Sequence, residues 1–229
     1  MAKTTSSEDN KTNSSKKTAL EKFKGEVGPV GFIGAIVGVV LLVVVTVLFF
    51  LNYQKKQKNI VAQNEIFQAQ YYYESDSLDL ALLGDGRNLG FLDIINIYGG
   101  TDVSNLAHFY AGASYLKKRE YQQAIDYLED FSTDEDIVQA RAKSLIGDAY
   151  MELGNFSDAA KNYQSAANTV DDSYFAPGYL LKAALAFEKN TDLQGAINVL
   201  STIIEDFKEA EEVIEARKQK ARLEALANR

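Results

Sequence analysis

The longest apolar segment of the chain runs from Val30 to Leu51 and contains no charged residue. Its 22 residues are close to the roughly 20 that a helix needs to cross a hydrocarbon core of about 30 Å. A cleavable signal peptide has a shorter apolar core, of about 7 to 15 residues, followed by small residues, whereas this run ends in Phe49, Phe50 and Leu51. We therefore expect residues 30–51 to form a transmembrane helix that stays in the protein as a signal anchor.

The segment before the apolar run is hydrophilic. Residues 1–29 are rich in Ser, Thr, Asn and Lys and have too few large apolar side chains to bury a core, so we expect a disordered tail. Within the run, Gly34 and Gly38 have the small-xxx-small spacing that lets a second membrane helix pack closely. Glycine is also common in membrane spans generally, so the spacing is consistent with a lone helix as well.

Lysines flank both ends of the predicted span, and they decide its orientation only weakly. Four precede the span and three follow it: Lys16, Lys17, Lys22 and Lys24, then Lys55, Lys56 and Lys58. The positive-inside rule is therefore almost balanced. A short basic tail in the cytoplasm with a large acidic C-terminal part translocated is the usual single-span arrangement, and we predict it here. The opposite orientation, with the C-terminal part in the cytoplasm, stays open.

A helical pattern continues beyond the span. Ile60, Phe67 and Tyr71 recur at i, i+7 and i+11, which is one face of a helix. The run of tyrosines at 71–73 is expected to end that helix.

Two short apolar segments come next, at residues 78–83 and 89–98, and Gly84 and Gly86 mark a loop between them. Terminal units of a repeat array are atypical because they have a neighbour on one side only. We assign residues 52–104 to a connecting helix and a degenerate first repeat.

Three better repeats follow, over residues 105–208. Each has a small residue, an aromatic three positions later and an alanine nine positions beyond the aromatic: Gly112, Tyr115 and Ala124; Gly147, Tyr150 and Ala159; Ala184, Phe187 and Ala196. The alanines lie 35 and 37 residues apart, in the range of solenoids built from helical hairpins. The constant internal spacing predicts one hairpin geometry used three times, with these residues packing its two helices together.

The final segment, residues 209–229, is acidic at its start and basic later. This order matches the helix dipole, which favours acids near the N-terminus and bases near the C-terminus. We predict a polar capping helix, which a solenoid requires for solubility.

The repeats resemble tetratricopeptide repeats. The middle unit carries the resemblance best, with Ile146 and Gly147, then Tyr150, Ala159, Tyr163 and Ala166. None of the three units has the closing Pro or the leading Trp of the family pattern. The resemblance covers about residues 105–229 and implies an all-α fold: a single N-terminal transmembrane helix followed by a tetratricopeptide-repeat α-solenoid. Such motifs specify a fold and not an activity.

The layout narrows the resemblance. A short hydrophilic tail, one signal anchor and a C-terminal array of this size are similar to those of YfgM-type proteins, ancillary subunits of the bacterial SecYEG translocon. The resemblance implies a single-pass protein of the bacterial inner membrane with a cytoplasmic N-terminus and a periplasmic repeat domain. It also implies two partners, the translocon and a membrane-anchored chaperone of the PpiD type. A scaffold for assembly of another envelope complex would have the same layout.

In tetratricopeptide repeats the first helix of each hairpin lines a concave groove. By that layout the groove positions here are Phe109, Ala113, Ser144, Asp148, Leu181 and Leu185. A clamp for a peptide's terminal carboxylate needs Lys and Asn at these positions, so that mode is disfavoured. Phe109, Leu181 and Leu185 suit an amphipathic helix or an extended apolar segment. The same side chains would equally suit packing against the next repeat.

Charge and cysteine content exclude several classes of chemistry. Residues 60–229 contain 15 Lys and Arg against 28 Asp and Glu, a formal charge of −13, whereas residues 1–59 carry +5. Because nonspecific affinity for nucleic acid comes from neutralising phosphates, we expect no nucleic-acid partner. The chain has no cysteine, which excludes disulfides, thiolate nucleophiles and Cys-ligated zinc.

The candidates for catalysis are weak. His108 is the one histidine, so it has no second His or Cys with which to share a metal, and we expect it to be packed. The sequence Gly84-x-Gly86-x-x-x-Gly90 has one residue too many for a dinucleotide-binding loop. We therefore expect no enzyme, no catalytic residue, no metal site and no cofactor.

Overall fold

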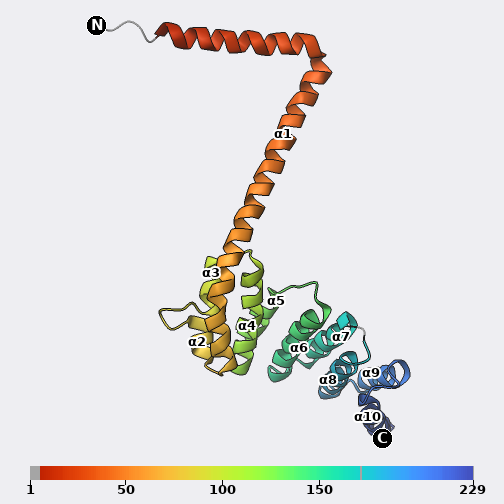
Figure 1. Cartoon of the computed structure of the whole chain (residues 1–229). Coiled ribbons are helices and arrows are strands. Elements are labelled where there is room, and N and C mark those ends of the chain that lie inside the picture. The colour runs from red at the N-terminus through yellow and green to blue at the C-terminus, as the bar shows by residue number, and fades with distance from the viewer. Residues whose placement is uncertain (1–5, 171, 229) are drawn as a thin grey trace. The chain divides into compact units, whose positions relative to one another are not determined.

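The computed structural model describes the backbone of residues 6–170 and 172–228, which is helical with short connections and contains no strand. The chain divides into two compact units, Met1–Lys56 and Gln57–Arg229, and α1 begins in the first and ends in the second. The helices, labelled in Figure 1, are α1 (Ser6–Glu74), α2 (Leu78–Leu83), α3 (Phe91–Ile97), α4 (Asp102–Lys117), α5 (Tyr121–Glu129), α6 (Asp136–Glu152), α7 (Phe156–Val170), α8 (Ala176–Lys189), α9 (Leu193–Asp206) and α10 (Glu212–Ala227).

The apolar part of α1 has no protein partner among the described residues. It is long and apolar enough to cross a membrane, and none of its apolar window is buried within the protein. Thr46 Oγ1 donates to the carbonyl of Leu42 (2.7 Å), so this hydroxyl is satisfied inside the apolar segment. A Cβ added at Gly34 or Gly38 would meet nothing within 4 Å, so both glycines lie on open surface.

The predicted tail differs in the structure, because α1 begins at Ser6 and residues 6–29 are helical. Helix growth from an existing helix costs far less than nucleation, so the apolar helix supports extension into a polar sequence. Residues 1–5 lie outside the described part of the chain.

The last turns of α1 belong to the second unit and bury a face other than the one formed by Ile60, Phe67 and Tyr71. Phe67 and Tyr71 are 66% and 61% exposed, and Ile60 is also exposed. The buried residues are instead Ala62, Ile66 and Ala69, which join a core with α2, α3 and α4. Two alanines on one face let the backbone of α1 approach its neighbours closely, whereas the bulkier face remains outside.

The three predicted hairpins are α4 with α5, α6 with α7, and α8 with α9. Consecutive helices from α4 to α10 pack against one another, as Figure 1 shows. The same hydrogen bond closes each hairpin turn: the backbone N–H groups of Glu120, Asn155 and Asp192 donate to the carbonyls of Tyr115, Tyr150 and Phe187, each at 2.9 Å.

Small residues bring the two helices of a hairpin together, as the repeat pattern predicts. The alanines Ala124, Ala159 and Ala196 are fully buried. A Cβ at Gly112 would lie 2.5 Å from Leu128 Cγ and 3.0 Å from the carbonyl oxygen of Ala124. These distances are below van der Waals contact, so no larger residue fits there without displacement. Tyr115, Tyr150, Ala184 and Phe187 all lie in or against the hydrophobic cores of the second unit.

The helix α10 covers the end of the array. Val213, Ala216 and Leu223 are buried against the core that α8 and α9 form. Arg222 adds a two-bond ion pair with Glu188 of α8, at 2.8 and 2.6 Å. This pair lowers the pKa of Glu188, chiefly through the hydrogen bonds from Arg222.

Candidate partner-binding groove

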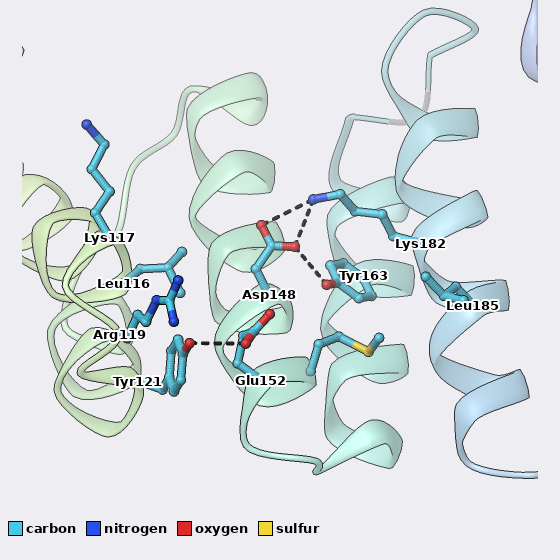
Figure 2. A pocket seen from close by; sticks show the side chains of 10 residues that line it. Leu116, Lys117, Arg119, Tyr121, Asp148, Glu152, Tyr163, Lys182 and Leu185 are labelled. Carbon is cyan, nitrogen blue, oxygen red and sulfur yellow. Dashed lines mark hydrogen bonds and ion pairs between the residues drawn. The ribbon is translucent and has the colours of Figure 1, made fainter.

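A groove of about 570 Å³ opens across the hairpins, and we call it the central groove (Figure 2). Side chains from α4, α5, α6, α7 and α8 line it, so it depends on all three hairpins being stacked in order. The lining residues are Leu116, Lys117, Arg119, Tyr121, Asp148, Met151, Glu152, Tyr163, Lys182 and Leu185.

An ion pair occupies the middle of the central groove. Lys182 Nζ lies 2.8 and 3.2 Å from the two carboxylate oxygens of Asp148 and also donates to Ser144 Oγ at 3.3 Å. The hydroxyl of Tyr163 donates to Asp148 at 2.7 Å. Burial, and then the charge of Asp148, raises the pKa of Tyr163, so the phenol stays protonated and keeps donating. Figure 2 shows these bonds converging on Asp148 from α7 and α8.

One end of the central groove holds a second group of polar contacts. Tyr121 donates to Glu152 at 3.0 Å, and burial followed by this bond raises the pKa of Tyr121. Lys117 pairs with Asp76 at 3.1 Å and lies over the ring of Tyr73. The guanidinium of Arg119 has no hydrogen bond or ion pair with any described residue.

A second, more apolar hollow of about 390 Å³ lies between α6 and α8, and we call it the aromatic pocket. Its lining consists of Ile137, Arg141, Tyr174, Phe175, Gly178, Tyr179 and Lys182. Lys182 lines both hollows, so the aromatic pocket adjoins the central groove.

The turn before α8 positions Tyr174, an exposed side chain of the aromatic pocket. Asp172 Oδ1 accepts hydrogen bonds from the backbone N–H groups of Tyr174 and Phe175, which fixes the turn before the helix. The Tyr174 ring is 80% exposed and packs edge-on against Phe175, with ring centroids 4.8 Å apart. Burial raises the pKa of Tyr179, and the charge of Arg141 opposes that shift.

The structure places the six predicted groove residues in different surroundings. Asp148 and Leu185 line the central groove, and buried Ser144 lies beneath it as a partner of Lys182. Phe109 and Ala113 pack in the core shared by α4, α5 and α6, and Leu181 packs against the C-terminal core. Their part in partner binding stays a prediction.

Sequence reasoning missed the charged lining of the groove. Lys182, Arg141 and Arg119 were not among the predicted positions, although Lys182 lies three residues before Leu185 and so shares its helix face. That spacing was the available signal for Lys182. The position of Arg119 depends on a turn, which helix periodicity does not describe.

The Asp148 carboxylate at the middle of this site is already engaged by other side chains of the protein. Among the described residues, no group of three or more His, Asp or Glu side chains is arranged to hold a metal. The Asp148 carboxylate already binds an ammonium and a phenol, which is the environment of a structural ion pair.

Comparison with known proteins supports the repeat assignment. Residues 106–134, which cover most of α4 and all of α5, match the tetratricopeptide repeat family. Ten solved chains match the structure; one is a Podosopora anserina protein described as a kinesin light chain with nearly identical TPR-like repeats. The match to it has a TM-score of 0.54 and 13% identity, and covers 73% of this chain and 87% of that one. No curated protein sequence matches the chain.

The fold is therefore an all-α, TPR-like solenoid preceded by one long apolar helix, as predicted from the sequence. Repeats of this kind serve as scaffolds for contacts between proteins, and the fold itself specifies no reaction.

Proposed function

We propose that this protein is a membrane-anchored adaptor that holds protein partners beside the bacterial Sec translocon, with a PpiD-like chaperone among them. The observation that supports it best is the combination of a solenoid with an open groove and an apolar helix with no protein cover. A contiguous apolar surface of this size requires lipid or another protein around it.

Anchoring in the same membrane as the partner lets weak contacts in the groove hold that partner. When the scaffold and its partner share one membrane, the second contact becomes effectively intramolecular, so binding is governed by a raised local concentration. In this proposal the membrane helix sets the location of the protein and the repeats select the partner. The chain lies in the inner membrane with its N-terminus in the cytoplasm and its repeats in the periplasm.

Affinity purification of the full-length protein in mild detergent tests the proposed location. Mass spectrometry should recover translocon subunits and a membrane-anchored prolyl isomerase. A matched variant in which an unrelated span replaces residues 30–51 separates contacts of the membrane helix from contacts of the repeats. Recovery of a different envelope complex, without translocon subunits, would refute the Sec assignment and leave the adaptor role intact.

A labelling experiment decides the orientation. Because the chain has no cysteine, a single Ser173→Cys substitution on the exposed turn before α8 gives one reporter, and Ser14→Cys gives its matched control. A membrane-impermeant maleimide applied to spheroplasts should label Ser173→Cys and spare Ser14→Cys. The reverse pattern would place the repeats in the cytoplasm.

A further inference from the structure

The two hollows of the groove have an excess of unpaired positive charge. Asp148 is paired with Lys182, whereas Glu152 is bonded to the neutral phenol of Tyr121 and keeps its charge, so the lining carries four cationic side chains against two carboxylates. Two guanidinium groups, those of Arg119 in the central groove and Arg141 in the aromatic pocket, have no ion pair or hydrogen bond with any described residue. Within a part of the chain whose formal charge is −13, this is a local reversal of sign.

Apolar side chains line the same two hollows as the two arginines. Leu116, Met151 and Leu185 line the central groove, and Leu185 is half-exposed. Ile137 and Tyr174 give the aromatic pocket a large exposed apolar surface. A segment that covers these side chains in both hollows would bring its own charged groups near Arg119 in the central groove and near Arg141 in the aromatic pocket.

We propose that this groove binds an acidic amphipathic segment of a partner protein. Carboxylates of the segment pair with Arg119 and Arg141, and its apolar side chains cover Leu185 and Tyr174. The planar guanidinium matches a carboxylate with two parallel hydrogen bonds, which gives both strength and orientation. The inference rests on the proposed adaptor function and names the chemistry of the partner.

Asp148 limits the affinity of the groove for such a segment. Its carboxylate lies within hydrogen-bonding distance of Lys182 and neutralises that ammonium group, as Asp76 does for Lys117. An Asp148→Asn substitution keeps an oxygen that accepts from Tyr163 but removes the charge. Lys182 then becomes available to a carboxylate of the partner, and affinity for an acidic segment rises.

The test measures binding of two labelled peptides to the full-length protein in detergent micelles by fluorescence anisotropy. One is an amphipathic peptide of Leu, Ala and Glu, about 15 residues long so that it can form a helix, and the other has Lys in place of each Glu. Both have blocked termini, and empty micelles give the background. The acidic peptide should bind at least about tenfold more tightly, although the net charge of the repeat domain favours the basic one.

Variants assign the contact to named residues. Arg119→Gln and Arg141→Gln should each weaken binding of the acidic peptide about fivefold, and Asp148→Asn should strengthen its binding by a similar factor. Arg217→Gln, on the exposed side of α10, is the matched control and should change nothing. Circular dichroism melts check that each variant is folded.

Three results would overturn the inference: no binding of either peptide, equal binding of both, or arginine variants that behave like Arg217→Gln. None of these bears on the co-purification experiment. Recovery of translocon subunits together with failure of the peptides would refute the groove chemistry alone. Success of the peptides without those subunits would refute the proposed location alone.

Discussion

Three residues in the left-handed backbone region follow the first helices of the hairpins, and only one of them is glycine. The φ angle is 64° at Arg119, 76° at Gly154 and 61° at Thr191. Each of these residues lies four positions after the aromatic residue that recurs in the repeats. Each also donates its backbone N–H to the carbonyl three residues earlier. The turn thus keeps one geometry whichever residue occupies it, and a β-branched residue such as Thr191 is strained there.

Thr191→Gly should therefore stabilise the repeat domain by about 0.5 to 1 kcal/mol. Glycine relieves the left-handed strain, and its greater freedom in the unfolded chain offsets part of the gain. Chemical denaturation of the protein in detergent measures the difference. Gly154→Ala makes the reverse change in the turn of the middle hairpin and should destabilise the protein by about 1 kcal/mol. If Thr191→Gly lowered the free energy of unfolding, the strain argument would be contradicted.

His108 illustrates a second residue-scale effect, since its Nδ1 is buried and has no hydrogen-bond partner among the described residues. Asp130 approaches Nδ1 to 3.9 Å, which is too far for a hydrogen bond. Desolvation lowers the pKa of His108, and the charge of Asp130 opposes the shift without cancelling it. Burial therefore favours the neutral form of His108.

A pH dependence of stability follows from the lowered pKa. The unfolded chain takes up a proton near the ordinary value of 6.5, and the folded chain does so only at lower pH. Above pH 6.5, His108 is neutral in both states and its titration does not reduce the free energy of unfolding. As the pH falls from 6.5 through the pKa of the folded state, protonation favours the unfolded chain and that free energy decreases.

His108→Leu should remove this loss and the unpaired nitrogen together, stabilising the protein by about 1 kcal/mol near pH 7.5. Its advantage over the natural protein should grow as the pH falls to about 5.5. Denaturation at both pH values gives the comparison, and an advantage that is constant with pH would exclude titration of His108 as the cause.

At the scale of helices, the separation within the first two hairpins depends on close contacts at a glycine. In the middle hairpin that contact joins Gly147 to the ring of Tyr163, where an added Cβ would lie 2.7 to 3.0 Å from three ring carbons. Tyr163 cannot turn aside freely, because it is buried and its hydroxyl is bonded to Asp148. The glycine of the repeat pattern is thus required by an aromatic sixteen residues later in the same hairpin.

Gly147→Ala should destabilise the protein by about 1 to 3 kcal/mol through overpacking. Gly178→Ala in α8 is the matched control, since the nearest atom to its added Cβ is a Glu212 carboxylate oxygen at 3.8 Å, and it should be neutral or stabilising. Thermal melts of both variants measure the effect. Equal melting temperatures would show that α6 and α7 can separate at no cost.

Sequence patterns predicted the helices well where spacing carries the information. The three hairpins expected from the repeat spacing are α4 with α5, α6 with α7 and α8 with α9, and each turn follows a repeated aromatic at a fixed distance. The pattern was uninformative for α1 beyond the span, where Ile60, Phe67 and Tyr71 form a regular face that the fold leaves exposed. Periodicity identifies a face, but only packing decides which face is covered.

The groove was predicted only in part, for a different physical reason. Its central ion pair joins residues 34 positions apart, on first helices of neighbouring hairpins. Such a pair depends on how far a lysine reaches and on the offset between hairpins. Neither quantity is encoded in the spacing of apolar residues, so the sequence pointed to Asp148 but not to the cations of the groove.

For the whole molecule, the boundary of the folded domain lies inside α1. Residues after Gln57 contribute Ala62, Ile66 and Ala69 to a core with α2, α3 and α4. Asn59 also caps α4: its Oδ1 accepts from the N–H of Val103 at 3.0 Å, and its Nδ2 donates to Asp102. The end of α1 is therefore structural in the repeat domain and is not a spacer.

A fragment that begins at Gln57 should fold and unfold in a single transition. One that begins at Ser77 should lose at least about 2 kcal/mol, because it removes the α1 residues Ala62, Ile66 and Ala69 from the core of this region and leaves α4 without its Asn59 cap. Circular dichroism melts and gel filtration compare the two fragments. If both melt alike, α1 contributes nothing to the domain.

The shared turn geometry also constrains how this architecture changes over evolutionary time. Each hairpin turns through the same aromatic, left-handed residue and alanine, so duplicating or deleting one complete hairpin leaves the turns of the other hairpins unchanged. A shorter insertion inside a helix would rotate the aromatic away from its alanine by about 100° per residue. The array, and with it the binding surface, therefore lengthens or shortens by whole repeats of about 35 to 37 residues.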